Sequence, residues 1–243
     1  MKGVVLAGGL GKRLEPLTRV TNKHLLPVYN QPMIYYPVKT LISAGIREIL
    51  IVTGGNNAGD FLRLLGNGED FGIKAIQYVY QKGERGIADA LKLAENFVGR
   101  EKFIVILGDN VLDQSIKPYA DQFNRQNEGA RILIKKVPNP ERFGVVQLKD
   151  KKIISIVEKP KRPLSDYIVT GVYMYDHQVF DFIRQLKPSA RGEFEITDVN
   201  NMYLEKHQLH YNVLKGSWTD CGIFDSLYRA NVIMAKQHFG ENG

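Results

Sequence analysis

Features typical of secreted or membrane proteins are scarce in this sequence. Its 243 residues include one cysteine, Cys221, so no intramolecular disulfide and no cysteine-based zinc cluster can form. No apolar run approaches the roughly eighteen residues that a membrane-spanning helix needs. Residues 1–3 lead into the first apolar run without a charged and then apolar leader. These absences predict a soluble cytoplasmic protein with no membrane partner.

Charge of one sign is not concentrated in any segment. The formal net charge is +7, but Lys and Arg alternate with Asp and Glu, and no block of five or six like charges occurs. The five histidines are scattered without the spacing of metal ligands. We therefore expect no nucleic-acid partner, whereas the basic excess is compatible with small anionic substrates.

The most informative stretch is a glycine loop near the start of the chain. The apolar run Val4–Ala7 is typical of a buried strand, and three of the next four residues, Gly8–Gly11, are glycine. Glycines let backbone N–H groups approach an anion without a Cβ in the way, and Arg13 and Lys23 can neutralise its charge. The stretch predicts a phosphate site.

Two well-known glycine motifs do not fit this loop. A P-loop needs a glycine where Leu6 stands and a hydroxyl residue where Arg13 stands. A dinucleotide fingerprint needs a small residue at Leu14 and an acid about twenty positions further on, where the chain has Pro27–Gln31. The sequence therefore supports neither a P-loop nucleotide site nor a dehydrogenase.

Apolar strands alternate with amphipathic helices in the first half of the chain. We expect strands at 4–7, 48–53, 73–80 and 103–107, and helices at 32–44, 58–65 and 87–97. Strands that are apolar throughout predict a parallel sheet with helices on both faces. Ligands bind at the carboxyl ends of strands in such sheets, so the glycine loop and Asp109 should share one edge.

The strands follow one another more closely in the second half. We expect strands at 131–137, 145–148, 153–157, 168–175 and 209–214, and helices at 177–186 and 196–206. A C-terminal helix should follow, with an apolar stripe that covers the core or, as the alternative, an oligomer interface: Phe224, Leu227, Tyr228, Val232 and Ala235. The close succession of strands predicts an added antiparallel segment that forms a wall for a substrate.

Two acidic residues occupy positions that packing explains poorly. Asp109 follows the apolar strand, and Asp220 lies between a strand and a helix in Trp218–Gly222. A turn or helix cap is the alternative for Asp109. Two carboxylates about 4 Å apart would repel by roughly 4 kcal/mol at an effective dielectric of 20, so they would need a cation between them. Oxygen ligands together with phosphates favour Mg²⁺, and we expect one ion bridging Asp109, Asp220 and a nucleotide phosphate.

The tripeptide Glu158–Pro160 closes the apolar run at 153–157. Because proline disfavours helical geometry in the residue before it, we expect Lys159 to be extended. On spacing alone, a solvated Glu–Lys pair on the surface is the simpler interpretation.

Taken together, these motifs resemble the glucose-1-phosphate thymidylyltransferases, a group of sugar-phosphate nucleotidyltransferases. The glycine loop reads L-A-G-G-x-G-x-R-L-x-P-L-T and is followed by N-K-x-L-L-P-V. The other matching segments are Leu107–Asn110, Glu141–Val145, Glu158–Pro160, Val169–Gly171, Arg191–Asp198 and Trp218–Asp220. The resemblance covers nearly the whole chain and is to the short forms, which lack a C-terminal helical extension.

The resemblance implies transfer of a thymidylyl group from dTTP to glucose 1-phosphate, with Mg²⁺ as cofactor and a homo-oligomer, a tetramer, as the assembly. The implied catalytic residues are Arg13, Lys23, Asp109, Lys159 and Asp220, with the metal on Asp109 and Asp220. The implied nucleotide-binding residues are Leu6, Gly8, Gly9, Gly11, Arg13, Gln81, Gly86 and Asp109. The implied sugar-phosphate-binding residues are Gly144, Glu158, Lys159 and Val169.

The implied fold is a Rossmann-like α/β domain. Its mixed, mainly parallel sheet has helices on both faces and an added antiparallel segment for the sugar. We expect a single nucleotidyltransferase domain over 1–243, with a nucleotide-binding part at about 1–115, a sugar-phosphate-binding part at about 116–222 and a C-terminal helix at about 223–243.

Some positions depart from the family pattern, and two other functions are compatible with the sequence. Leu10 and Lys12 replace small hydroxyl residues, Asp89 replaces a glutamine, and Cys221–Phe224 differs from the usual sequence after the aspartate. The same chemistry with UTP, CTP or another sugar 1-phosphate is one alternative. The other is a non-catalytic regulatory protein that binds a nucleotide or a sugar phosphate, although such a protein would not need both acids.

Overall fold

The computed structural model describes residues 1–55 and 58–240, and the chain forms two compact units. We call residues 2–84, 106–118 and 216 onward the glycine-loop unit. Met1 with residues 85–105 and 119–215 is called the Lys159 unit. Two of the points at which the chain passes from one unit to the other fall within β6 (Phe103–Leu107) and α5 (Lys117–Arg125). The expectation of a single nucleotidyltransferase domain stays a prediction.

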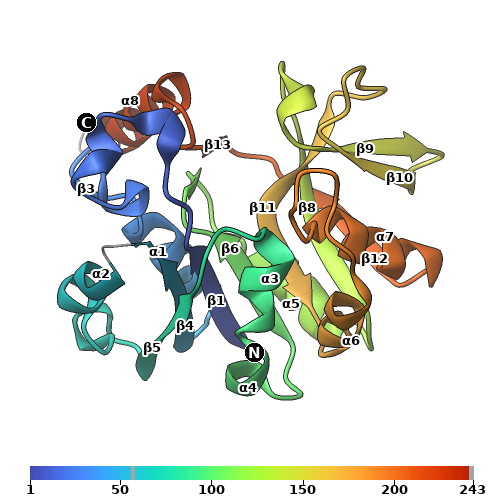
Figure 1. The fold of residues 1–243 in the computed structure, drawn as a ribbon, viewed down its shortest axis with the longest axis horizontal. Helices are drawn as coiled ribbons and strands as arrows, with labels where there is room; N and C mark the ends of the chain where they lie inside the picture. Colours follow the sequence, from blue (N-terminus) through green and yellow to red (C-terminus); the bar gives the residue numbers. More distant parts are fainter. Residues whose placement is uncertain (56–57, 241–243) are drawn as a thin grey trace. The chain divides into compact units, whose positions relative to one another are not determined.

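Parallel strands form the base of the glycine-loop unit (Figure 1). β1 (Lys2–Ala7) pairs with β4 (Glu48–Gly54), and β4 pairs with β5 (Ala75–Gln81), all in parallel. Val4 and Val5 have no exposed surface, as expected for strands that are covered on both faces. The parallel sheet expected from the first half of the sequence is confirmed here.

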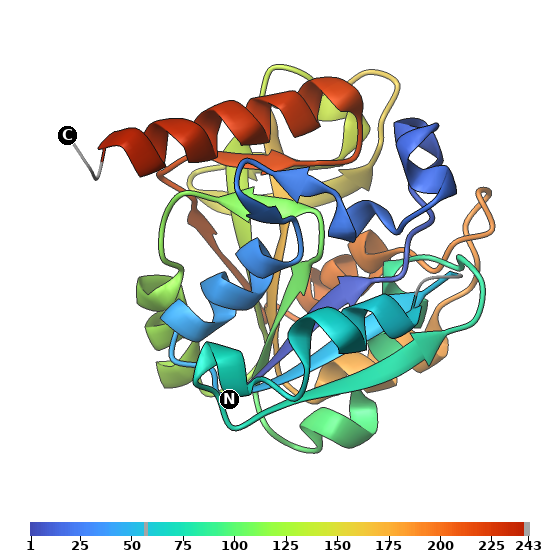
Figure 2. The same cartoon turned by 90° about the vertical axis from the view of Figure 1, so that its left-hand side faces the viewer.

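Two helices pack on this parallel ladder. α1 (Tyr35–Ser43) contacts β1, and α2 (Ala58–Leu65) contacts β4 and β5. Figure 2 shows α2 lying along β5. In the described part of the chain, no helix combines the length and the hydrophobicity needed to cross a bilayer.

The helix expected at 32–44 begins later than predicted. Residues Pro27–Val28 (β2) and Gln31–Pro32 (β3) form a small antiparallel hairpin. The next two amides also bond outside any helix, since Met33 N–H donates to the Leu26 carbonyl and Ile34 N–H to the His24 carbonyl. The hairpin occupies the chain up to Pro32, and the α-helix begins at Tyr35, with Ile34 as its N-cap residue.

A short antiparallel pair joins segments that are distant in the sequence. β7 (Asn110–Leu112) pairs with β13 (Trp218–Asp220), with Asp220 opposite Asn110. Beyond the pair, Cys221 N–H donates to the Asp109 carbonyl at 2.8 Å. The sequence did not predict either strand, because three residues are too few to show a period of two.

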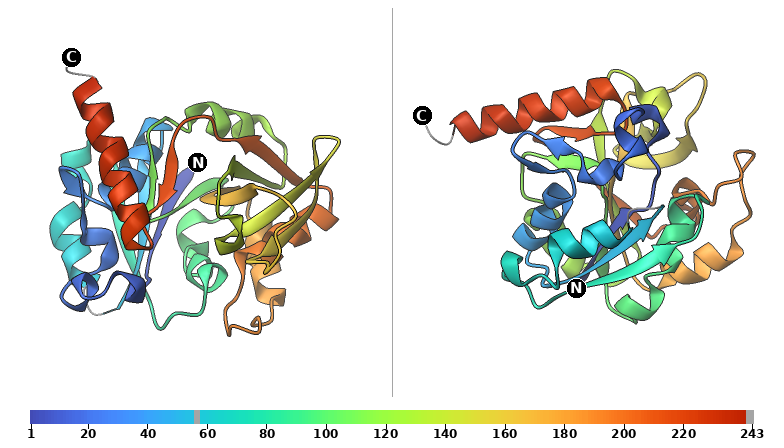
Figure 3. Two further views of the ribbon diagram at one scale, coloured as in Figure 1. Left: turned by 90° about the horizontal axis from the view of Figure 1, so that it is seen from above. Right: turned by 60° about the vertical axis from the view of Figure 1, so that its left-hand side comes forward.

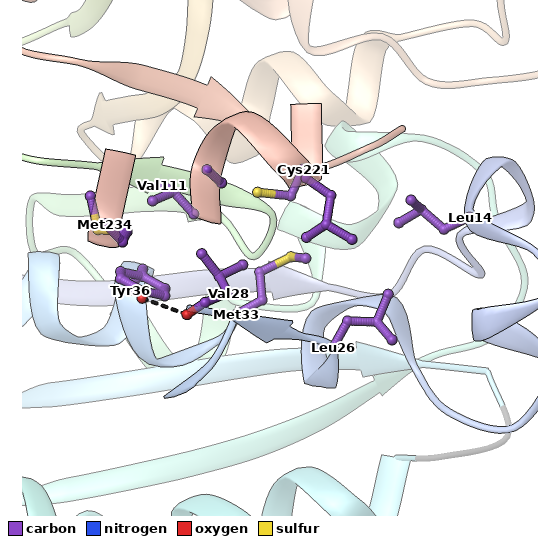
Figure 4. Packing of buried hydrophobic residues seen from close by; sticks show 10 residues of the cluster. Leu14, Leu26, Val28, Met33, Tyr36, Val111, Cys221 and Met234 are labelled. Atoms are coloured by element: carbon purple, nitrogen blue, oxygen red, sulfur yellow. Dashed lines mark hydrogen bonds between the residues drawn. The ribbon is translucent and has the colours of Figure 1, made fainter. Parts of the chain in front are cut away.

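A buried apolar cluster secures α8 (Phe224–Gly240) to the first part of the chain (Figure 4). Its members are Leu14, Leu26, Val28, Met33, Tyr36, Val111, Cys221, Leu227, Ala230 and Met234. Tyr36 also donates a hydrogen bond from its hydroxyl to the Val28 carbonyl at 2.7 Å. Fully burying one such side chain contributes about 1.5–3 kcal/mol, so the cluster holds the segment after the glycine loop firmly in place.

The core position expected for the apolar stripe of the C-terminal helix was mostly wrong, and the alternative, an oligomer interface, stays a prediction. Leu227 is buried as expected, but Phe224 is 47% and Tyr228 is 73% exposed. Ala230 and Met234 complete the core-facing side of α8 instead. Residues three or four apart share a face, so the pattern predicted the helix itself, but several apolar residues lie outside the face that packs.

Antiparallel strands dominate the Lys159 unit, as the sequence predicted. β9 pairs with β10, and β8 and β11 pair in the same antiparallel manner, whereas β12 runs parallel to β8. The strands span Ala130–Lys136 (β8), Gly144–Lys149 (β9), Lys152–Glu158 (β10), Tyr167–Tyr175 (β11) and Leu209–Val213 (β12). The short turn at 150–151 makes β9 and β10 a hairpin, visible in Figure 3.

Helices of the Lys159 unit agree less closely with expectation. α6 (Gln178–Gln185) and α7 (Ile196–Glu205) were predicted, and α7 packs against β10. The helix expected at 87–97 is divided into α3 (Ile87–Lys92) and α4 (Glu95–Val98). The amides between them bond three residues back, which tightens the turn and ends α3. The sequence missed α5, whose buried side chains are only Ala120 and Phe123.

Several connections contain short 3₁₀ turns. They lie at Lys12–Leu14, Leu17–Arg19, Lys23–Leu25, Glu69–Phe71 and Pro140–Arg142.

Met234→Ala tests the core cluster. The substitution removes a side chain that is 6% exposed, and we expect the free energy of unfolding to fall by about 2–4 kcal/mol. Tyr228→Ala on the same helix is the control, with an expected change within about 0.5 kcal/mol. Urea denaturation measures both values, and equal losses in the two variants would contradict the assigned packing face.

Candidate active site

The glycine loop lies against the end of β5. A Cβ on Gly8 would lie 2.7 Å from Oε1 of Gln81, and a Cβ on Gly54 would lie 2.8 Å from the Gly8 carbonyl oxygen. Gly11 has φ 71° and no room for a side chain, because a Cβ there would lie 2.8 Å from Cβ of Lys23. The loop thus needs glycine for both space and backbone conformation. The structure brings Gly8 and Gln81 together, as a nucleotide site requires.

One backbone N–H of the loop already donates a hydrogen bond to a carboxylate. Leu10 N–H donates to Oε1 of Glu84 at 2.7 Å. Backbone N–H groups of this kind are the donors that the sequence assigned to a phosphate. No sequence pattern pointed to Glu84, since it lies 74 residues from its partner in a loop without a motif.

Lys23 and Asp109 form an ion pair next to the loop. Their Nζ and Oδ2 atoms are 2.6 Å apart, and each side chain is 14% exposed. Burial would raise the pKa of the Asp109 carboxyl, but the Lys23 ammonium outweighs it and holds this pKa well below its usual range. Gly108 N–H donates to the Leu6 carbonyl at 2.8 Å, which places Asp109 beside the end of β1. Asp109 therefore lies near the glycine loop, as predicted.

Asp220 lies on the strand that pairs with the residue after Asp109. The neighbouring Gly222 is close to two charged groups, because a Cβ there would lie 3.0 Å from Oδ2 of Asp220 and 3.1 Å from Nη2 of Arg13. The glycine-loop unit thus gathers two carboxylates and two cations that the sequence selected separately. It also contains the remaining predicted residues of the nucleotide side except Gly86: Leu6, Gly8, Gly9, Gly11 and Gln81.

The donor set fits a hard cation whose remaining ligands are substrate and water oxygens. In the described part of the chain, no group of three or more His, Cys, Asp or Glu side chains could hold a metal. Asp109 and Asp220 would supply two carboxylates, and Mg²⁺ is commonly held by one or two carboxylates together with phosphates. Each carboxylate oxygen has two lone pairs, so Asp109 can accept hydrogen bonds and bind a cation as well.

His24 and Cys221 are buried beside this group and do not supply charge. Burial, assisted by the Lys23 charge, lowers the pKa of the His24 ring to about 3, so the ring is neutral. Its Nδ1 lies 2.7 Å from Oδ1 of Asn22, which also accepts from the His24 backbone N–H. Burial raises the pKa of the Cys221 thiol, which makes it a packing residue.

The predicted sugar-phosphate residues lie on strands of the Lys159 unit. Glu158 pairs with Gly144 across β10 and β9, and its Oε2 accepts from Thr197 Oγ1 at 2.6 Å. A Cβ on Gly144 would lie 3.4 Å from the same Oε2 atom. Val169 follows Ile168, which is paired with the residue after Gly144. The structure therefore brings Gly144, Glu158, Lys159 and Val169 to one region.

Lys159 differs from its predicted conformation. It has φ 42°, so it is in the left-handed region and is not extended. The prediction was wrong because a hydrogen bond at the end of the β9–β10 ladder outweighs the local preference for an extended conformation. Lys159 N–H donates to the Phe143 carbonyl at 3.0 Å. A non-glycine residue in this conformation stores strain, and such strain is concentrated at functional sites.

Sequence reasoning assigned no role to Arg191, although it noted the segment Arg191–Asp198. The Arg191 guanidinium contacts Glu195 at 2.9 Å, Glu193 at 3.0 Å and Glu158 at 3.5 Å. Burial would lower the pKa of Arg191, but these carboxylates raise it. The arginine is thus a charged neighbour of Glu158. The R-G-E-x-E spacing could have indicated its pairs with Glu193 and Glu195, but not the one with Glu158.

Gly86 also belongs to the Lys159 unit. It has φ 98°, and a Cβ there would lie 2.6 Å from the Phe194 carbonyl oxygen. Phe194 N–H donates to the Arg85 carbonyl at 2.8 Å on the preceding residue. These contacts explain the glycine by close backbone packing, and its role toward a nucleotide stays a prediction.

The parallel strands and the glycine loop, with Arg13, Lys23, Asp109 and Asp220 close to it, define an α/β protein that gathers charged groups of both signs at one loop. The chain belongs to the nucleotidyl transferase family, whose sequence model matches residues 2–237. It is therefore an enzyme of the nucleotidyltransferase class. The expected fold, a mixed and mainly parallel sheet with helices and added antiparallel strands, is confirmed by the solved structures that it resembles.

Relatives match over nearly the whole chain. The glucose-1-phosphate thymidylyltransferase of Neisseria meningitidis is 48% identical over 95% of this chain and 81% of the relative. That of Mycolicibacterium smegmatis is 46% identical with the same coverage. A crystal structure of a Bacillus anthracis protein described as such an enzyme has TM-score 0.92 and 52% identity, covering 96% of this chain and 94% of that one. A UDP-glucose pyrophosphorylase with UDP-glucose has TM-score 0.85 and 25% identity over 97% and 98%.

Glu84→Ala tests whether the loop amide is an anion donor. Without the carboxylate, Leu10 N–H is open to a phosphate oxygen and a like charge is removed, so we expect inorganic triphosphate to bind several-fold more tightly. Isothermal titration calorimetry measures the affinity, with Glu69→Ala, an exposed acid of the same unit, as the control. Unchanged or weaker binding would contradict this assignment of the amide.

Lys159→Gly tests the strain at Lys159. Glycine adopts positive φ without steric cost, so the free energy of unfolding should rise by about 1 kcal/mol in urea denaturation. Lys161→Gly, at an exposed position without positive φ, is the control and should not stabilise the protein. A loss of stability in Lys159→Gly would show that the lysine side chain matters more than the strain.

Proposed function

We propose that this enzyme transfers a thymidylyl group from dTTP to glucose 1-phosphate, forming dTDP-glucose and releasing pyrophosphate. The observation that carries the proposal is the grouping of Arg13, Lys23, Asp109 and Asp220 around the glycine loop in one unit. Relatives that are 42–48% identical and carry the name glucose-1-phosphate thymidylyltransferase support the choice of substrates.

In this proposal the glycine-loop unit takes the nucleotide. Leu6 and Gly8 contact the base, and the buried Gln81 reads the thymine edge with its amide, which can both donate and accept. Gly9 and Gly11 let the triphosphate approach the backbone, and Arg13 neutralises the leaving pyrophosphate. The resemblance also assigns Gly86, a residue of the Lys159 unit, to the nucleotide.

The residues of the Lys159 unit take the sugar phosphate. Glu158 is held by Thr197 at 2.6 Å, so one of its oxygens has a fixed direction and the carboxylate can accept from sugar hydroxyls. Gly144 and Val169 line the sugar. Lys159 orients the phosphate that attacks.

The reaction is an in-line displacement without a covalent protein intermediate. An oxygen of glucose 1-phosphate forms a bond to the α-phosphorus of dTTP, and the bond from that phosphorus to pyrophosphate breaks. Asp109 and Asp220 would hold a Mg²⁺ ion, which would supply charge neutralisation for the reacting phosphates. Lys23 holds Asp109 in place through its 2.6 Å ion pair and adds positive charge beside the phosphates.

The same chemistry on UTP is the second candidate, favoured by the likeness to a UDP-glucose pyrophosphorylase. A panel of dTTP, UTP and CTP with several sugar 1-phosphates, run with and without Mg²⁺, separates the candidates by pyrophosphate release. We expect the highest kcat/KM for dTTP with glucose 1-phosphate and no turnover without the metal. A higher kcat/KM for UTP would contradict thymidylyl transfer and favour uridylyl transfer instead. The cytoplasmic location and the homotetramer stay predictions.

Asp109→Asn tests the role of the carboxylate. The substitution keeps the shape but removes the charge that pairs with Lys23 and would bind the metal, so kcat should fall by about 10²-fold or more. Asp225→Asn, an exposed acid on α8, is the control and should retain full activity. Pyrophosphate release measures both, and near-normal turnover of Asp109→Asn would refute the metal assignment.

A further inference from the structure

We propose that Trp218 is a positioning residue for Asp109 and acts through Asn110. The proposal rests on the proposed function of Asp109 as a metal ligand. The indole Nε1–H of Trp218 donates to Oδ1 of Asn110 at 2.6 Å, and Nδ2–H of Asn110 donates to Oδ1 of Asp109 at 3.0 Å. Trp218 is 8% and Asn110 1% exposed, so water competes little with these bonds.

The chemistry of Trp218 gives this hydrogen-bond chain a direction. An indole N–H can only donate, so the carboxamide oxygen of Asn110 has to face it. The Asn110 NH₂ group is then turned toward Asp109, where it meets an acceptor. A flipped amide would place its oxygen against the carboxylate, and the lone pairs would repel. Trp218 thereby selects the one orientation of Asn110 that supports an ionised Asp109.

The carboxylate of Asp109 is consequently held on both oxygens. Asn110 donates to Oδ1, and the Lys23 ammonium, also a pure donor, contacts Oδ2 at 2.6 Å. Two hydrogen bonds fix the rotation of the carboxylate plane and leave a further lone pair on each oxygen. Groups that orient a metal ligand in this way typically change metal affinity by about 10–100-fold when removed.

The strand pair alone does not require this chain of side chains. β7 and β13 are already joined through their backbones, with Trp218 opposite Leu112 and Asp220 opposite Asn110. The hydrogen bonds from Trp218 lead to the side chain of Asp109, which the backbone pairing leaves free to rotate. The chain therefore ties the orientation of Asp109 to the strand that carries Asp220.

Trp218→Phe tests the proposal, because phenylalanine keeps most of the buried ring and lacks the N–H. We expect the affinity for Mn²⁺ alone, measured by electron paramagnetic resonance, to fall about tenfold, and half-maximal activity to need correspondingly more Mg²⁺. Asn110→Ala should lose at least as much. In the Asn110→Ala background, adding Trp218→Phe should change the Mn²⁺ affinity less than twofold, because the two residues act in series.

Tyr36→Phe is the matched control for a merely structural effect. It removes another buried aromatic donor of the same unit, the 2.7 Å hydrogen bond to the Val28 carbonyl, which lies outside the Asp109 chain. We expect it to lower the free energy of unfolding by about 1 kcal/mol and to leave Mn²⁺ affinity unchanged.

Two outcomes would overturn the proposal, and they can be told apart. If Asp109→Asn weakens Mn²⁺ binding but Trp218→Phe leaves it within twofold, or if the Trp218 and Asn110 effects add, the positioning role fails alone. If Mn²⁺ binding does not depend on Asp109, the metal role in the proposed function fails and the positioning role fails with it.

Discussion

The ion pair between Lys23 and Asp109 is the interaction on which the candidate site depends. Both side chains are largely buried, and a buried charge is tolerated only when it is paired and hydrogen-bonded. The pair keeps Asp109 ionised beside the glycine loop, for which we propose phosphate binding and where an isolated carboxylate would repel the phosphates. A cation that joins Asp109 and Asp220 would extend the same principle, since it allows two carboxylates and a triphosphate to share one region.

The surrounding structure holds this charge arrangement in place. The β7–β13 pair places Asp109 and Asp220 on adjacent backbone segments, although they are far apart in the sequence. The core cluster secures the segment after the glycine loop to α8, so Arg13 and Lys23 are carried on a well-packed support. In the Lys159 unit, the hairpin of β9 and β10 fixes Glu158 beside Gly144. Functional groups on such rigid elements are held more precisely than groups on loops.

Glu84 and Lys159 show where sequence reasoning reached its limit at the site. Glu84 belongs to no recognisable motif, yet its carboxylate accepts a hydrogen bond from Leu10 N–H of the glycine loop, 74 residues away in the sequence. Lys159 was expected to be extended because of Pro160, but its φ is 42°. A local steric preference of this kind is small enough for a β-ladder hydrogen bond and its surroundings to override.

The sequence by itself determined the parallel strands of the first half and the antiparallel strands of the second, because hydrophobic periodicity is local. Local glycine and charge patterns selected the glycine loop, Arg13, Lys23, Asp109 and Asp220, whereas the other candidate site residues came from the resemblance to a known family. Only the tertiary structure decided the β7–β13 pair, the face of α8 that packs and the contacts of Lys23, Trp218 and Asn110 with their partners. Those are long-range contacts, and their energies come from burial and from side chains that meet only once the chain is folded.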